Sequence, residues 1–133
     1  MKSSKKELYA LTQEVAVKRL KSSKKELYAL IQEVAVKRHP ICPWCDKPSV
    51  VGHHLFKRDR LATAFLPEAV QGGCDFHHKY WHKHPKGFRH EMIRMIGDRY
   101  WELERLSYTV VRNMDYGEVK KKLTGLLKGG MPE

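Results

Sequence analysis

Two short cysteine motifs constrain what this 133-residue chain can fold into. Cys42 and Cys45 form a C-x-x-C pair, and after a hairpin-sized gap Cys74 and His77 form a C-x-x-H pair. Two motifs of this kind can converge into one tetrahedral site, and their thiolate and imidazole groups suit zinc. Because four protein ligands leave no position open for chemistry, we expect a structural Zn2+ that clips a hairpin to the helix behind it. His78 is an alternative fourth ligand.

The cysteine count favours a metal over a disulfide. An odd number of cysteines, three, argues against a closed disulfide framework and for a reducing compartment. The alternatives are three buried free cysteines, or a redox site at residues 42–45 that lacks the strand-then-helix context of a thioredoxin motif. The sequence has no apolar run of membrane-spanning length and no secretory signal, so it predicts a cytoplasmic protein without a membrane partner.

The chain is strongly basic, with a formal net charge of +11. An excess of Lys and Arg favours a polyanionic partner, because phosphate contacts release counterions and supply sequence-independent affinity. Lys57, Arg58 and Arg60 lie in a loop that follows the His53-His54 pair, so we expect them to contact the phosphates of a nucleic acid, most simply DNA. RNA is an alternative substrate. The sequence determines neither the oligomeric state nor whether the DNA is duplex or branched.

The N-terminus contains a near-perfect tandem repeat, residues 2–19 and 21–38, in which Thr12 of the first copy stands where the second has Ile31. Each copy has apolar residues at helical spacing. On one straight helix the two apolar stripes would lie about 100° apart and could not face one surface. We therefore expect the second copy, residues 21–39, to pack on the core and residues 1–20 to be an appended duplicate, natural or engineered.

The rest of the chain predicts an α+β fold. We expect a zinc-stapled core at residues 40–86, C-terminal helices at 87–128 and a tail at 129–133. Within the core, residues 49–56 and 61–71 form a hairpin, residues 72–73 a turn and residues 74–83 a helix that Pro85 stops. Residues 87–106 form an amphipathic helix with a weak point at Gly97, and residues 107–128 form one more segment.

Most of the eight histidines fall in two tight groups. His53 and His54 lie on the expected strand, while His78 and His82 are four residues apart and share one face of a helix. Imidazoles converging from both sides suit phosphodiester hydrolysis: a metal ion can stabilise the scissile phosphate, and a neutral imidazole can deprotonate water. Because neighbouring strand residues point to opposite sides, both His53 and His54 reach the site only at an irregular strand end. We interpret His39, His84 and His90 as helix-end or surface residues.

These motifs resemble the zinc-containing branch of the HNH (ββα-metal) endonucleases over residues 40–84, and most of all the phage recombination nucleases of the NinG (Rap) type. The matching segments are residues 52–58, 63–65 and 88–97. The resemblance implies a small ββα-metal core with structural zinc knuckles, flanked by N-terminal and C-terminal α-helices. It also implies DNA cleavage with a catalytic divalent metal (Mg2+, Mn2+ or Ni2+). By position, His54 would be the general base, His53 and His78 metal ligands, and His82 a third ligand or a phosphate contact.

Two positions depart from that family pattern. Ala69 stands where the family has an Asn that braces the hairpin loop, and Ala64 stands where it has an Arg. Gln71 is a candidate substitute for the Asn. These changes concern the rate more than the reaction class. The competing interpretation is a non-catalytic zinc-ribbon DNA-binding module, although such a module has no reason to keep the four histidines.

Overall fold

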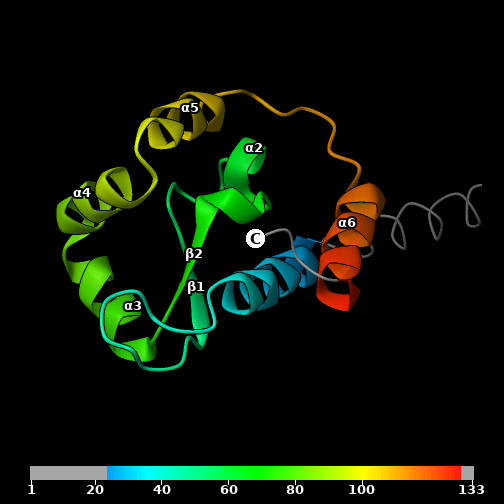
Figure 1. Ribbon diagram of the computed structural model, residues 1–133. Helices are drawn as coiled ribbons and strands as arrows, with labels where there is room; N and C mark the ends of the chain where they lie inside the picture. The colour runs from blue at the N-terminus through cyan, green and yellow to red at the C-terminus, as the bar shows by residue number, and fades with distance from the viewer. Residues whose placement is uncertain (1–23, 130–133) are drawn as a thin grey trace, which may run out of the picture.

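The computed structural model describes residues 24–129, which form an α+β fold (Figure 1). Residues 24–38 are helical. Along the chain follow β1 (Val51–His54), α2 (Leu61–Ala64), a 3-10 turn (Pro67–Ala69), β2 (Val70–Gly73), α3 (Asp75–Lys83), α4 (Pro85–Ile96), α5 (Asp98–Ser107) and α6 (Tyr116–Lys128). The expected appended duplicate at residues 1–20 and most of the expected tail lie outside the described residues.

The antiparallel pair β1 and β2 lies between two hydrophobic clusters. The register pairs Val51 with Gly73 and His54 with Val70. Helix 24–38, α2 and α6 share one cluster. The other contains Trp81, Phe88 and Tyr100, from α3, α4 and α5. Figure 1 shows these two groups of helices on opposite sides of the strands.

Helix 24–38 packs directly on the hairpin. Its apolar stripe, Leu27, Ile31 and Val34, is fully buried, so the second repeat copy forms a core helix, as expected. The approach is close because Gly52 of β1 has no side chain: a Cβ there would lie 2.8 Å from the Cβ of Ala35. The Gln32 side chain also accepts a hydrogen bond of 2.6 Å from the Gly52 backbone N–H.

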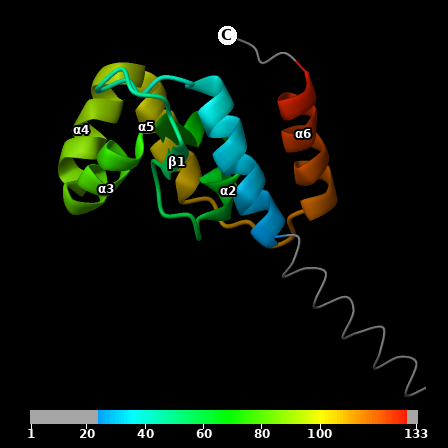
Figure 2. The ribbon, with the colours of Figure 1, turned by 90° about the horizontal axis from the view of Figure 1, so that it is seen from below.

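Helix α6 runs beside helix 24–38 and parallel to it (Figure 2). Near its start, Lys120 pairs with Glu26 at 2.8 Å. At its end, the Lys37 ammonium donates to the carbonyls of Leu127, at 2.6 Å, and Gly129, at 3.1 Å. A cation at a helix C-terminus satisfies orphan carbonyls and interacts favourably with the helix dipole. The sequence indicated no partner for this last helix.

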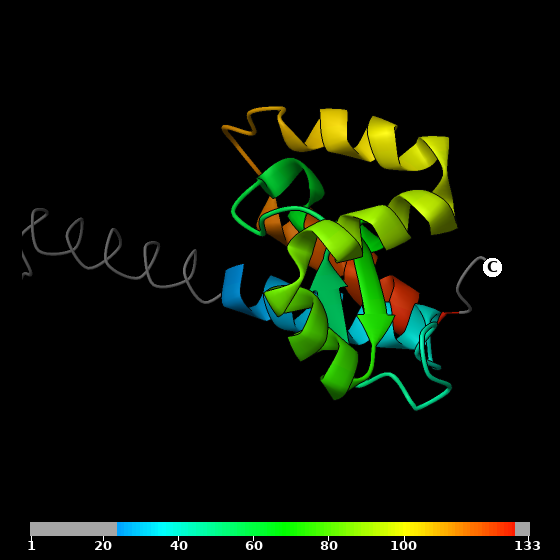
Figure 3. The ribbon, with the colours of Figure 1, turned by 90° about the vertical axis from the view of Figure 1, so that its left-hand side faces the viewer.

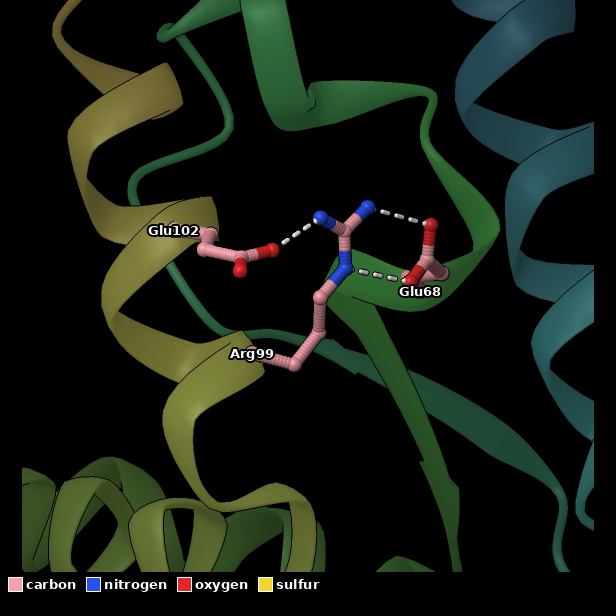
Figure 4. Close-up of polar contacts among 3 residues, drawn as sticks. All are labelled: Glu68, Arg99 and Glu102. Atoms are coloured by element: carbon pink, nitrogen blue, oxygen red, sulfur yellow. Dashed lines mark hydrogen bonds and ion pairs between the residues drawn. The ribbon is translucent and has the colours of Figure 1, made fainter.

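Arg99 attaches α5 to the 3-10 turn that precedes β2. Its guanidinium makes two hydrogen bonds with the Glu68 carboxylate, at 2.8 and 2.9 Å, and a third with Glu102 at 2.6 Å (Figure 4). The Arg99 hydrogen bonds hold the pKa of Glu68 below its usual range. The three side chains are each about half exposed, so this network orients α5 more than it stabilises the fold.

Several sequence expectations about these elements were wrong. Residues 61–71 do not return as one strand, because α2 and the 3-10 turn occupy residues 61–69. The expected turn at residues 72–73 is part of β2. Gly72 serves close packing instead, since a Cβ there would lie 2.6 Å from the Ala35 carbonyl oxygen. The predicted weak point at Gly97 is confirmed, because the expected helix at 87–106 is divided there into α4 and α5, and the Gly97 φ of 60° suits glycine.

Pro85 does end α3 and opens α4, which starts at residue 85 instead of 87. The first strand covers only residues 51–54 of the expected 49–56. Between residues 24 and 129, no helix combines the length and apolar character needed to cross a membrane.

Candidate metal centres

The cysteine motifs meet as expected, at the start of α3. The potential ligand atoms of Cys42, Cys45, Cys74 and His77 all lie within 4.8 Å of one another. Nδ1 of His77 is 3.3 Å from Sγ of Cys74 and 3.6 Å from Sγ of Cys42. The sulfurs of Cys45 and Cys74 are 3.5 Å apart. Ligands around one tetrahedral zinc would be about 3.5 Å apart for sulfur and nitrogen and about 3.8 Å for two sulfurs. The Cys3His cluster therefore has the composition and spacing to bind a metal such as zinc.

The helix start favours a thiolate in this cluster. Cys74 caps α3, and its sulfur accepts a hydrogen bond from the backbone N–H of His77. Burial opposes ionisation of Cys74, but hydrogen bonds from His77 and the neighbouring thiols outweigh it and lower the Cys74 pKa to about 6. Thiolates are the form of cysteine that binds metal. The sequence left His77 and His78 open as the fourth ligand, and the structure brings His77 to the cysteines.

Three histidines, His53 on β1 and His78 and His82 on α3, form a second cluster. The potential ligand nitrogens of His53, His78 and His82 lie within 4.8 Å of one another, and Nε2 of His78 is 3.2 Å from Nε2 of His82. Two nitrogens on one tetrahedral ion at about 2.05 Å would be about 3.4 Å apart. Three protein ligands leave positions open for water or substrate, as catalytic sites require.

His53 is held for this role by its surroundings. Its ring centroid lies 4.1 Å from that of Phe88 and 4.6 Å from that of His82. Nδ1 of His53 is buried without a hydrogen-bond partner among residues 24–129, which is uncommon for a buried polar atom. Burial, followed by the neighbouring charges of His82 and His78, lowers the His53 pKa to about 3. The ring is neutral at pH 7, the form that binds metal.

His54 points away from this cluster. Its Nε2 lies 2.9 Å from the Ala64 carbonyl oxygen, and its ring lies edge-on to Tyr28 at 6.3 Å. A carbonyl oxygen can only accept, so Nε2 carries the hydrogen and Nδ1 keeps its lone pair. Burial, with a smaller contribution from the Arg58 charge, lowers the His54 pKa. His54 is thus a neutral imidazole whose tautomer is set by the backbone.

Both neighbouring histidines nevertheless line one open cleft of about 760 Å³. β1 ends at His54, so the strand alternation that separates the two rings stops there. The cleft runs between the two hydrophobic clusters, with Tyr28 and Gln32 on one wall and Phe88, Arg89 and Tyr100 on the other. The sequence did not indicate most of these cleft residues. The two walls come from segments far apart along the chain, and no local pattern connects them.

The basic loop contributes unequally to the cleft. Lys57 and Arg58 line it, but Arg60 does not. The Arg60 guanidinium donates to the Ser107 hydroxyl at 3.2 Å and lies 4.4 Å from the centre of the Tyr108 ring. The structure therefore brings Arg60 to the end of α5, where it connects two elements.

Of the two positions that depart from the family pattern, Ala64 is the last residue of α2 and Ala69 lies directly before β2. Ala69 is buried, and its carbonyl accepts a hydrogen bond of 2.9 Å from the Leu55 backbone N–H. Gln71 is also buried, and its amide donates to the Gly72 carbonyl at 3.0 Å. The Gln71 side chain therefore bonds within β2, and a different side chain reaches the loop at residues 57–60: the Tyr28 hydroxyl donates a hydrogen bond of 2.8 Å to the Arg58 carbonyl.

Compared with models of known protein families, with curated proteins and with solved structures, the chain matches none of them. Its relationship to the HNH endonucleases therefore stays a prediction.

Proposed function

We propose that this protein is a metal-dependent HNH-type endonuclease that hydrolyses phosphodiester bonds of DNA, by nicking or cutting. The observation that carries the proposal is the convergence of His53, His78 and His82 in a cleft that His54 and Arg58 also line. Three imidazoles from a strand and a helix form an incomplete ligand set, and a further imidazole and a guanidinium line the same cleft.

The histidine cluster would hold a catalytic divalent ion (Mg2+, Mn2+ or Ni2+). Such an ion neutralises the scissile phosphate and stabilises the leaving oxygen. His53 is kept neutral by burial, and the helical spacing of His78 and His82 presents both rings to the same point. Because the Cys3His cluster joins the segment before β1 to the start of α3, zinc at that cluster would help to fix the position of α3, which carries His78 and His82.

His54 would act as the general base. With its Nε2 hydrogen donated to the Ala64 carbonyl, Nδ1 is the nitrogen that can take the proton from an attacking water. Lys57 and Arg58 would hold phosphates at the same side of the cleft, which positions DNA without reading its sequence. A role in phage recombination or DNA processing follows from the sequence resemblance alone.

The test is conversion of supercoiled plasmid to nicked and linear forms by zinc-loaded protein with Mg2+, Mn2+ or Ni2+. We expect His54→Ala to lower the rate on the order of 10²–10⁴-fold while zinc content and DNA binding stay unchanged. His78→Ala should weaken the catalytic metal, so that high Mn2+ restores part of the rate. His90→Ala is the matched control, since His90 is an exposed histidine on α4.

Two results would contradict the proposal. One is a parent protein that cleaves no DNA with any of these metals. The other is cleavage by both histidine variants at the parent's rate. DNA binding without cleavage would favour the zinc-ribbon DNA-binding module instead.

A further inference from the structure

The outer face of α3 carries a row of aromatic rings that no core uses. Phe76 is 63% exposed and Tyr80 is 41% exposed, and their rings are nearly parallel, with centroids 6.2 Å apart and planes at 20°. The His84 ring continues the row, 4.4 Å from Tyr80. Neither Phe76 nor Tyr80 belongs to a hydrophobic cluster of the described residues. We call Phe76, Tyr80 and His84 the aromatic row.

The aromatic row lies on the opposite side of α3 from the candidate catalytic metal site (Figure 3 shows this helix in front of the strands). Tyr80 is two positions from both His78 and His82, which places it about 160° away around the helix. The two sides of α3 also line two different hollows of the protein surface. The cleft takes His78 and His82 from α3, whereas the outer hollow is lined by Phe76, Tyr80 and their neighbours on the helix.

Positive charge flanks the aromatic row. Lys79 and Lys83 line the same outer hollow. Lys79 pairs with Asp75 at 2.9 Å, but both side chains are more than 60% exposed, so phosphate can compete for this ammonium. Lys83 takes part in none of the ion pairs between residues 24 and 129. Because the chain has a net charge of +11, charge repulsion disfavours the binding of a second copy of the same chain to this surface. Exposed rings beside lysines are instead complementary to a polyanion with flat bases.

We propose that the aromatic row binds unpaired bases of single-stranded DNA, with Lys79 and Lys83 at the phosphates. Bases stack on aromatic side chains without regard to sequence, and lysines follow the backbone. The choice of DNA rests on the proposed function, since the same rings would accept any single strand.

The binding test uses zinc-loaded full-length protein without any other divalent ion, so that cleavage plays no part. Fluorescence anisotropy measures the affinity for a labelled oligothymidylate and for a duplex of equal length. We expect Phe76→Ala and Tyr80→Ala each to weaken single-strand binding on the order of tenfold, with little change in duplex binding. Phe76→Tyr should retain binding, whereas Phe76→Leu, which keeps apolar bulk without a ring, should lose it.

Zinc content and circular dichroism establish that each variant is folded. Single-strand binding that is unchanged in the Phe76→Ala/Tyr80→Ala double variant would overturn the proposal, as would binding of single-stranded RNA but not DNA. An effect of Lys79→Gln and Lys83→Gln without any effect of the ring variants would also overturn it. His78→Ala separates the two proposals, because it should slow cleavage and leave single-strand binding intact.

Discussion

His77 and His78 are consecutive residues of α3, yet they belong to two different clusters. Nδ1 of His77 is 3.3 Å from Sγ of Cys74, and Nε2 of His78 is 3.2 Å from Nε2 of His82. Successive residues of a helix point about 100° apart, so one turn of α3 serves both clusters. A metal bound at the Cys3His cluster would therefore also orient the helix face that carries His78 and His82.

Loss of the Cys3His cluster should unfold the domain. In Cys74→Ser the protein should purify without zinc and lack cooperative unfolding, because binding free energy at a structural zinc site is largely folding free energy. Metal analysis and thermal denaturation measure both effects. His78→Ala is the control and should keep one zinc per chain. Folded parent protein that contains no zinc would contradict the assignment.

Ile31 should matter far more than its counterpart in the first repeat copy. Ile31 is completely buried, so Ile31→Thr, which introduces the first copy's residue, should cost roughly 2–4 kcal/mol in the free energy of unfolding through lost packing and a buried hydroxyl. Thr12→Ile should change it by less than about 0.5 kcal/mol, and deletion of residues 2–20 should leave the zinc core folded. Urea denaturation measures all three. Failure of the deletion variant to fold would make the first copy part of the core.

The contact between helix 24–38 and β1 should not tolerate a methyl group. Gly52→Ala would bring a Cβ to 2.8 Å from the Cβ of Ala35 on this helix and to 2.7 Å from Cγ1 of Val70 on β2, and such overpacking typically costs about 1–3 kcal/mol. Gly125→Ala on α6 is the matched control. Nothing lies within 4 Å of the added Cβ there, so helix propensity should make it stabilising by about 0.5–1 kcal/mol. Equal urea midpoints for the two variants would show that the packing at Gly52 is looser than described.

The three basic loop residues should have two different functions, DNA binding for Lys57 and Arg58 and stability of the fold for Arg60. Lys57→Gln and Arg58→Gln should weaken duplex binding similarly for all sequences and reduce the salt slope by about one per lost phosphate contact. Arg60→Gln should instead lower the free energy of unfolding by about 1 kcal/mol, because it removes the bond to Ser107 and the contact with Tyr108. Salt titrations and denaturation distinguish the two. Weaker DNA binding by Arg60→Gln at unchanged stability would return Arg60 to the DNA contacts that the sequence predicted.

The Arg99 and Glu68 pair should stabilise the fold slightly, and only above acidic pH. Because Arg99 lowers the pKa of Glu68 from an ordinary value of 4.5, the unfolded state binds more protons when the pH falls below 4.5. The contribution is therefore complete above that pH and disappears as Glu68 is protonated in the folded state. A double-mutant cycle with Glu68→Gln and Arg99→Gln should give a coupling of about 0.2–1 kcal/mol at pH 7. A coupling that is unchanged at pH 3 would contradict this.

The sequence by itself determined the composition of both clusters. Cys42, Cys45 and Cys74 were predictable because ligand type and spacing reflect local geometry, a knuckle at one end and a helix turn at the other, whereas His77 was favoured over His78 but not decided. His78 and His82 share a face for the same local reason. The stripe that buries Leu27 and Val34 also followed from helical periodicity, which depends only on neighbours along the chain.

Only the tertiary structure decided which groups those side chains meet. The Ala64 carbonyl sets the tautomer of His54, Arg60 turns to Ser107 and away from the cleft, and Gly72 packs against a helix instead of forming a turn. The aromatic row is likewise available to a ligand only because the packing of α3 leaves the outer face of this helix uncovered. In each case the deciding neighbour lies on another element or is absent, and short-range patterns carry no information about such contacts.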